Sequence, residues 1–419
     1  MLGGRQALNL SQRYLASIGT HLLLLFFVRP HFPTAIISFG VCDAFVSQFS
    51  PNVQYDVSNS WISLSRRLHQ RGRDLVPFSS GVAPDLQAAS RSIDVPDLPG
   101  LVTTEWLADH VDDEDLAILD VRGEVAKAPV TNGTQESEYI ALKGDYVDAH
   151  IPNAAFVDWI EDIAYTDDAG VPVQILPLDD FRVCMESRGV GLRKRVVIYD
   201  NGNFLFATRL WWALRIAGHQ AVAILDGGWN KWLAEDWPVT ADAPCPLKIN
   251  EAWESEFIAT SVDGAMIPSF LSSRVNASQV LQFCQEDSGS ENVQIIDARS
   301  REQYMGRISR SSRAGHIPRA RSMPYKDLLT PPIVHPLSRH PYRLMKSKDA
   351  LELTLREAGV SIDGQATPLT CVYCNGGVAS TVVIFVLNQL YGMRTSNFDG
   401  SWNEWGKRED FPVSSEMDK

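Results

Sequence analysis

Apolar and polar positions follow the same succession of strand-type and helix-type patterns twice along the chain. Short β-branched apolar runs alternate with segments whose apolar residues recur at helical spacing, and glycine often stands where that spacing ends. The expected strands are 116–120, 196–199, 221–225, 293–297, 369–373 and 395–398, and the expected helices are 103–110, 178–188, 207–217, 277–286, 348–358 and 379–391. Such alternation predicts an α/β fold with mostly parallel sheets and helices on both faces.

Five sequence anchors recur in the same order in both halves, which indicates two copies of one module. The paired anchors begin at Asp120 and Asp297, His150 and His316, Asp200 and Cys374, Asp226 and Asp399, and Asp236 and Asp410. The predicted domain boundaries are an N-terminal extension at 1–100, a first domain at 101–242, a linker at 243–275 and a second domain at 276–416.

The two copies differ at the residue that follows a central strand, which is Asp200 in the first copy and Cys374 in the second. Ligands of parallel sheets lie outside the carboxyl ends of the strands, where both residues are expected. The glycines after Cys374 allow a tight loop, and the next helix offers unpaired N–H groups and its positive dipole end. These features favour a thiolate, so we predict Cys374 as a nucleophile whose sulfur anion or persulfide the loop would hold. The predicted active-site loop consists of Asn375, Gly376, Gly377, Val378, Ala379 and Ser380.

These motifs resemble the tandem-domain rhodanese family, which includes thiosulfate and 3-mercaptopyruvate sulfurtransferases. The likeness covers residues 100–415 and rests on Asp297-Ala-Arg299, Gly315-His316-Ile-Pro, the Cys374 loop and Asp399-Gly-Ser-Trp402. It implies two rhodanese-like three-layer domains, of which the first is catalytically silent. It also implies a covalent persulfide on Cys374 with no other cofactor and no metal. The implied partners are a small-molecule sulfur donor and a thiol, cyanide or thioredoxin-like acceptor.

The same resemblance implies that Asp297, Arg299 and His316 lie near the site, with a structural Asp–Arg pairing as the alternative. The loop departs from the family, because Gly376 stands where the mercaptopyruvate type commonly has serine and Asn375-Gly376 where the thiosulfate type has a basic pair. Gln303 occupies the place of a substrate-binding arginine. Guanidinium groups pair well with carboxylates, so a nearby arginine is expected to replace it. The candidates are Arg301, Arg307, Arg310 and Arg313, and we favour Arg313.

Several other functions are alternatives to sulfur transfer from a small molecule. A rhodanese-fold phosphatase would need arginine six residues after the cysteine, where this chain has Ser380. A non-enzymatic binding module, or a protein-to-protein sulfur relay such as one for tRNA thiolation, remains open. The Cys371-x-x-Cys374 spacing also occurs in redox and zinc sites, but the strand alternation places the two thiols on opposite faces. Cys371 is therefore expected to be a buried apolar residue.

Charge separates the two ends of the chain. The net charge is −13, yet residues 1–73 contain seven arginines and only two aspartates. The acidic remainder argues against nucleic acid as a partner. Residues 57–73 are arginine- and serine-containing and lack acidic residues, which predicts a mitochondrial presequence. A secretory or membrane-anchoring segment and a cytoplasmic location are the alternatives. Neither the sulfur donor nor the oligomeric state follows from the sequence.

Overall fold

The computed structural model describes residues 98–127, 137–191, 194–242, 273–285, 293–338, 340–364 and 369–415. Nearly all of the predicted extension at 1–100, with its presequence-like stretch, therefore lies outside the described residues. Within the described ranges, no helix combines the length and apolar character that a membrane crossing requires.

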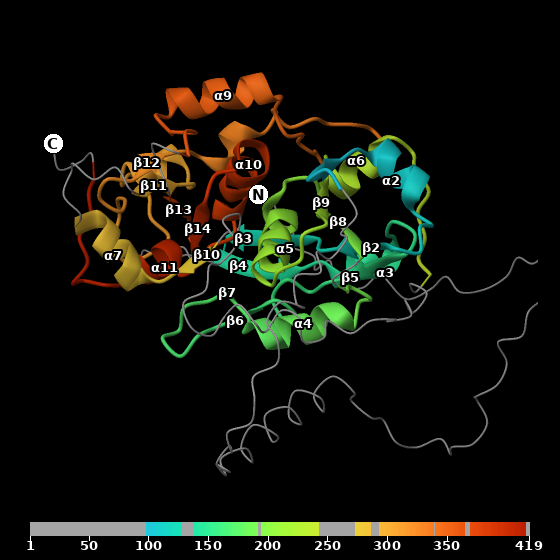
Figure 1. Cartoon of the computed structure of the whole chain (residues 1–419), viewed down its shortest axis with the longest axis horizontal. Coiled ribbons are helices and arrows are strands. Elements are labelled where there is room, and N and C mark those ends of the chain that lie inside the picture. The colour runs from blue at the N-terminus through green and yellow to red at the C-terminus, as the bar shows by residue number, and fades with distance from the viewer. Residues whose placement is uncertain are drawn as a thin grey trace, which may run out of the picture. The chain divides into compact units, whose positions relative to one another are not determined.

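The first domain contains a five-stranded sheet in which all strands run parallel (Figure 1). In spatial order, its strands are β1 (Leu101–Val102), β9 (Val222–Leu225), β8 (Arg195–Tyr199), β2 (Leu116–Asp120) and β5 (Ala154–Phe156). Its helices are α2 (Thr104–His110), α3 (Lys143–Asp148), α4 (Leu178–Glu186), α5 (Leu205–Ile216) and α6 (Gly228–Ala234).

The second domain repeats this parallel sheet with the same topology. Its strands, in spatial order, are β10 (Ser273–Val275), β14 (Thr395–Phe398), β13 (Leu369–Tyr373), β11 (Val293–Asp297) and β12 (Arg321–Ser322). Its helices are α7 (Ala277–Gln285), α8 (Arg301–Tyr304), η2 (Tyr325–Leu328), α9 (Lys348–Glu357), α10 (Ser380–Tyr391) and α11 (Ser401–Trp405), of which η2 is a 3₁₀ helix.

The first domain also contains two small antiparallel hairpins. They are formed by β3 (Gly123–Lys127) with β4 (Ser137–Ala141), and by β6 (Ala164–Tyr165) with β7 (Gln174–Ile175). Both hairpins contribute residues that contact the second domain, as described below.

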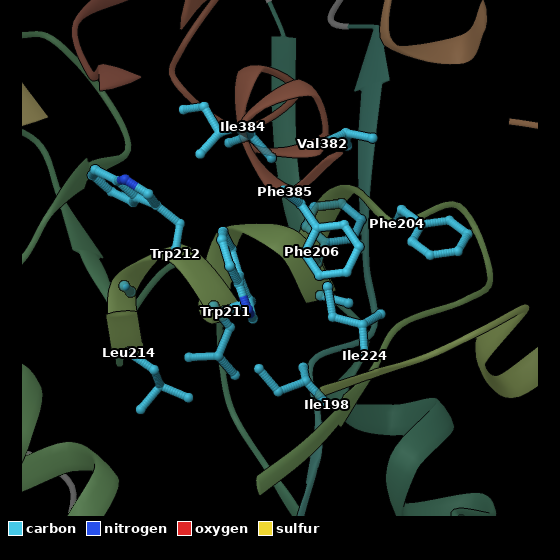
Figure 2. Close-up of a cluster of buried hydrophobic side chains, with 14 of the residues drawn as sticks. Ile198, Phe204, Phe206, Trp211, Trp212, Leu214, Ile224, Val382, Ile384 and Phe385 are labelled. Carbon is cyan, nitrogen blue, oxygen red and sulfur yellow. The ribbon is translucent and has the colours of Figure 1, made fainter. Parts of the chain in front are cut away.

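The two domains share one hydrophobic core, which forms where α5 packs against α10. Figure 2 shows Phe206 and Trp211 of α5 facing Phe385 of α10, and the Trp211 and Phe385 rings meet edge to face at 5.1 Å. The outer face of each sheet has its own smaller core. Strand residues therefore alternate between the shared core and an outer core, as the period of two in a strand requires.

The predicted α/β architecture with two rhodanese-like domains is confirmed. Four strands have the predicted bounds, namely β2, β11, β13 and β14. The predicted start of the second domain at 276 needs correction. Strand β10 pairs with β14 in parallel, so the sheet of the second domain begins at Ser273, inside the predicted linker.

Candidate active site

Cys374 directly follows the central strand β13, and its side chain is only 3% exposed. The loop that begins at Cys374 is held by hydrogen bonds to the first residues of α11. The backbone N–H of Trp402 donates to the Cys374 carbonyl at 3.0 Å, and the N–H of Asn403 donates to the Asn375 carbonyl at 2.8 Å. The Ser401 hydroxyl accepts from the N–H groups of both Cys374 and Gly377, each at 3.0 Å. The loop is therefore fixed before any substrate binds.

The first domain has a loop at the corresponding position, which begins at Asp200. One Asp200 carboxylate oxygen accepts the N–H groups of Gly202, Asn203 and Phe204 at 2.8–3.3 Å. The other oxygen accepts from Phe206 and Ala207 at 3.1 and 3.2 Å. Burial raises the pKa of Asp200, and these N–H bonds oppose that rise. The loop fold is thus an anion cradle, which the first domain fills with its own side chain.

Counting from Cys374 as from Asp200, the corresponding donors are five backbone N–H groups. They belong to Gly376, Gly377, Val378, Ser380 and Thr381. The Gly377 N–H donates to Ser401, and the Thr381 N–H donates to the Val378 carbonyl at 3.1 Å. Gly377 has a φ of 73°, a left-handed conformation that glycine adopts without steric cost.

Asp297 and Arg299 form a buried pair rather than an exposed binding site. The Arg299 guanidinium donates to the Asp297 carboxylate at 2.6 Å and to the Gly315 carbonyl at 2.7 Å, and it lies over the Trp402 ring. The Tyr373 hydroxyl donates to the same Asp297 oxygen at 2.7 Å.

The first domain repeats this arrangement almost contact for contact. Arg122 pairs with Asp120, donates to the Ala149 carbonyl at 2.7 Å and lies over Trp229, while Tyr199 donates to Asp120. Because the copy without the cysteine keeps it, the arrangement supports the structural pairing that the sequence left as the alternative.

His316 also has a counterpart in the first domain. Its ring stacks on Tyr304 with 3.8 Å between centroids, and its Nδ1 lies 2.7 Å from the Tyr304 carbonyl oxygen. His150 stacks on Tyr146 in the same way at 4.1 Å, with its Nδ1 2.8 Å from the Tyr146 carbonyl oxygen. This repetition again indicates a role in the scaffold.

Arg313, the arginine favoured from the sequence, contacts the C-terminal segment. Its two terminal nitrogens donate to the carbonyl oxygens of Phe411 and Trp405, at 2.8 and 3.0 Å. The structure therefore engages this guanidinium in holding the chain end.

Arg310 is the candidate arginine that contacts the hairpin of the first domain. It donates to the Ser137 hydroxyl of β4 at 3.1 Å, across the domain boundary. Two tyrosines, Tyr139 and Tyr325, lie in the same region, and burial raises the pKa of both. Burial raises the pKa of Tyr325 to about 12, so this phenol remains protonated at neutral pH.

The sequence did not identify Tyr139 and Tyr325 as site residues. The Tyr139 hydroxyl lies 3.3 Å from the Asn403 side-chain amide, beside the loop. The one available signal was that the segment between Arg122 and His150 is longer than its counterpart between Arg299 and His316. Extra chain between shared anchors marks a feature that one copy has and the other lacks.

The first domain also fixes the Cys374 loop through Arg209 on α5. Its guanidinium donates to the Gly377 carbonyl at 3.0 Å, to the Asp399 carboxylate at 2.6 Å and to the Val173 carbonyl at 2.8 Å. Both members of the Arg209–Asp399 pair are 1% exposed. The second Asp399 oxygen accepts the N–H of Ile175 at 2.8 Å. The catalytic loop is thus partly built from the other domain.

Cys371 lies on the opposite face of β13 from Cys374, as the strand alternation predicts. It is fully buried in the outer core, whereas Cys374 belongs to the shared core. Burial raises the pKa of Cys371 to about 12, so its thiol stays protonated at neutral pH. Across the described ranges, no group of three or more histidine, cysteine or acidic side chains is arranged to hold a metal ion.

Both halves of the chain are similar in sequence to known proteins. The family described as the rhodanese-like domain matches residues 103–235 and 281–408. A 3-mercaptopyruvate sulfurtransferase of Escherichia coli is 32% identical over 316 residues, covering 74% of this chain and 96% of that protein. A sulfur carrier protein of Thermus thermophilus is 26% identical, covering 75% of this chain and 96% of that protein.

Two further matches extend this picture. An Arabidopsis thaliana thiosulfate/3-mercaptopyruvate sulfurtransferase described as mitochondrial is 25% identical, covering 87% of this chain and 94% of that protein. An Escherichia coli structure, described by the rhodanese fold and mechanism of 3-mercaptopyruvate sulfotransferases, aligns with a TM-score of 0.53 and 27% identity. That alignment covers 73% of this chain and 99% of the solved chain.

A duplicated parallel α/β domain with one cysteine in an anion-cradling loop defines the class as a tandem-domain sulfurtransferase. The chain belongs to the rhodanese family, with two rhodanese-like domains in tandem, and it is an enzyme rather than a binding module.

We predict that Arg209→Met lowers the free energy of unfolding by about 3–5 kcal/mol, because it leaves the buried Asp399 carboxylate with only the partly exposed Arg274 as an ionic partner. Urea unfolding followed by tryptophan fluorescence measures the change. Arg182→Met is the control, since Arg182 pairs with the largely exposed Asp179 and should cost under about 1 kcal/mol.

The double variant Arg209→Met with Asp399→Leu should regain part of the loss, because no unpaired charge remains. A cost below about 1 kcal/mol for Arg209→Met would show that the pair does not hold the domains together.

Proposed function

We propose that this enzyme moves a sulfane sulfur from 3-mercaptopyruvate to a thiophilic acceptor through a persulfide on Cys374. The Cys374 thiolate attacks the donor sulfur, and the resulting persulfide is then discharged to a thiol or a thioredoxin-like protein. Two easier steps replace one difficult transfer. The chemistry needs no metal or further cofactor.

The observation that carries this proposal is the pair formed by Asp200 and Cys374. In the first domain, five N–H bonds surround a carboxylate in this loop. The corresponding loop begins at Cys374 in the second domain, where the side chain is a thiol and the N–H groups of Gly377 and Thr381 are bonded to Ser401 and Val378. A persulfide that extends from this thiol is an anion of the kind such a cradle holds.

The choice of donor rests on the charges around the loop. Asn375 and Gly376 carry no charge, and the Asn375 amide oxygen accepts from Gln303 at 3.0 Å. A thiosulfate dianion would therefore meet a neutral loop. Arg310, which contacts the hairpin of the first domain, suits a single carboxylate, to which guanidinium can form two parallel hydrogen bonds. Thiosulfate is the second candidate donor.

A protein acceptor is the second candidate use of the same persulfide. One relative is named a sulfur carrier protein, and its alignment spans both domains of this chain. A protein-to-protein relay would keep the Cys374 chemistry and change only the acceptor.

Incubation with 3-mercaptopyruvate is predicted to add the mass of one sulfur atom to the protein. Intact-protein mass spectrometry should show the gain in the wild type and in Cys184→Ser, and not in Cys374→Ser. Reduced thioredoxin should then remove it. A folded wild type that gains no sulfur from 3-mercaptopyruvate or thiosulfate would refute small-molecule sulfur transfer.

We predict that Arg310→Met raises the KM for 3-mercaptopyruvate about tenfold to a hundredfold, the range expected for a lost charge-assisted hydrogen bond. Steady-state kinetics with a thiol acceptor measure it. Arg307→Met is the matched control, because Arg307 is an exposed neighbour. Equal KM values for the two variants would remove Arg310 from the donor site.

We also propose that residues 1–100 direct the enzyme to mitochondria. Their composition supports this, and the alignment with the mitochondrial relative covers 87% of the chain, too large a share to lie wholly within residues 101–419. A fluorescent reporter fused to residues 1–100 should enter isolated mitochondria. Replacement of Arg66, Arg67, Arg71 and Arg73 by glutamine should abolish entry, and retention of the unaltered fusion outside would exclude the proposal.

A further inference from the structure

The β3–β4 hairpin of the first domain has no counterpart in the second domain. The equivalent stretch there, between Arg299 and His316, forms the short helix α8 instead. The hairpin places Tyr139 beside the Cys374 loop. An edge-to-face contact with Trp159, at 5.5 Å between centroids, holds the tyrosine ring in position.

The Tyr139 hydroxyl is closely placed against the loop. The Asn403 side-chain amide donates to the phenolic oxygen at 3.3 Å. A Cβ atom built on Gly376 would lie 3.3 Å from this oxygen, 3.0 Å from the Asn403 nitrogen and 3.1 Å from a Val173 methyl group. The tyrosine hydroxyl thus occupies the space beside Gly376 that a side chain on the loop would need.

Polar groups of both domains meet at this point. Arg310 reaches from the second domain to the Ser137 hydroxyl, two residues before Tyr139 on the same face of β4. The Tyr139 oxygen meets two neighbouring donors, the Asn403 amide and the Ser137 hydroxyl, and its own O–H proton can be donated to a further acceptor. Arg310 and Tyr139 therefore offer a cation and a neutral donor to one small molecule.

We propose that Tyr139 is a catalytic residue of this site and donates its hydroxyl hydrogen bond to the carbonyl oxygen of a 2-oxo acid donor. The proposal rests on the proposed function and deepens it, because it assigns the donor class to a contact between two domains. Arg310 would hold the donor carboxylate, and Tyr139 would contact the adjacent carbonyl.

Transfer of sulfur from 3-mercaptopyruvate to Cys374 forms one bond and breaks one bond. The Cys374 thiolate forms a bond to the donor sulfur, and the bond between that sulfur and C3 breaks. The electron pair passes to C3 and the neighbouring carbonyl, so the leaving group is the enolate of pyruvate. C3 then takes a proton from water. Cys374 is oxidised to the persulfide, and C3 is reduced to a methyl group.

Negative charge therefore develops on the oxygen that Tyr139 would contact. A donor placed in advance where charge develops stabilises the transition state more than the ground state. Burial raises the pKa of Tyr139, which keeps the phenol protonated and able to donate.

Tyr139→Phe, which removes only the hydroxyl, tests this role. We expect the rate of persulfide formation from 3-mercaptopyruvate to fall about tenfold to a thousandfold, in the range of a lost oxyanion donor. Inorganic polysulfide has no carbonyl group, so its rate should change less than about twofold. Rapid-quench mass spectrometry of the full chain measures both rates.

Two further tyrosine variants complete the experiment. Tyr391→Phe is the control, because this partly exposed tyrosine lies at the end of α10. Tyr325→Phe tests the other hydroxyl near Cys374. An unchanged rate in Tyr139→Phe, an equal loss with both donors, or a donor-specific loss in Tyr325→Phe alone would overturn the proposal. A wild type that forms no persulfide would instead refute the proposed function.

Discussion

The structure depends on the buried ion pair between Arg209 and Asp399. Two opposite charges removed from water are costly unless every polar atom is satisfied, and here the remaining groups contact backbone atoms of both domains. The pair therefore fixes the domain boundary at the point where the catalytic loop turns. It gives a physical reason for a chain to retain a first domain that has no nucleophile. Without Arg209, the Gly377 carbonyl would keep the side-chain amide of Asn397 from its own domain as a donor and would lose its hydrogen bond to the first domain.

The duplication supplies an internal control for the site. Contacts found in both domains, such as the Asp297–Arg299 pair and the stacked His316, belong to the scaffold because the copy without the cysteine has them too. Features found once are of another kind, namely the thiol of Cys374, the Arg209 contact and the Tyr139 hydroxyl. The Asp200 carboxylate shows that backbone N–H groups of a loop at this position can bind an anion.

Sequence reasoning located the long elements well and the short ones poorly. The central strands are apolar on both faces, and α5 and α10 are long, so their patterns are strong. Strands of two or three residues, such as β6 and β10, have too few positions to show a period. Cys374 and its loop stand out in the sequence because the comparison of two copies isolates one substitution. Arg310 could not be separated from Arg313, because both stand in a loop where no periodicity fixes the direction of a side chain.

The sequence by itself determined the duplication, the parallel sheets and the position of the cysteine at a strand end, because these follow from local spacing and backbone preference. The tertiary structure alone decided which side chains of the first domain surround the cysteine. Arg209 and Asp399 are 190 residues apart, and Tyr139 and Asn403 are 264 apart. Contacts between residues so far apart in the chain form only when α5 packs against α10 and brings the domains together. Local sequence patterns do not predict such packing.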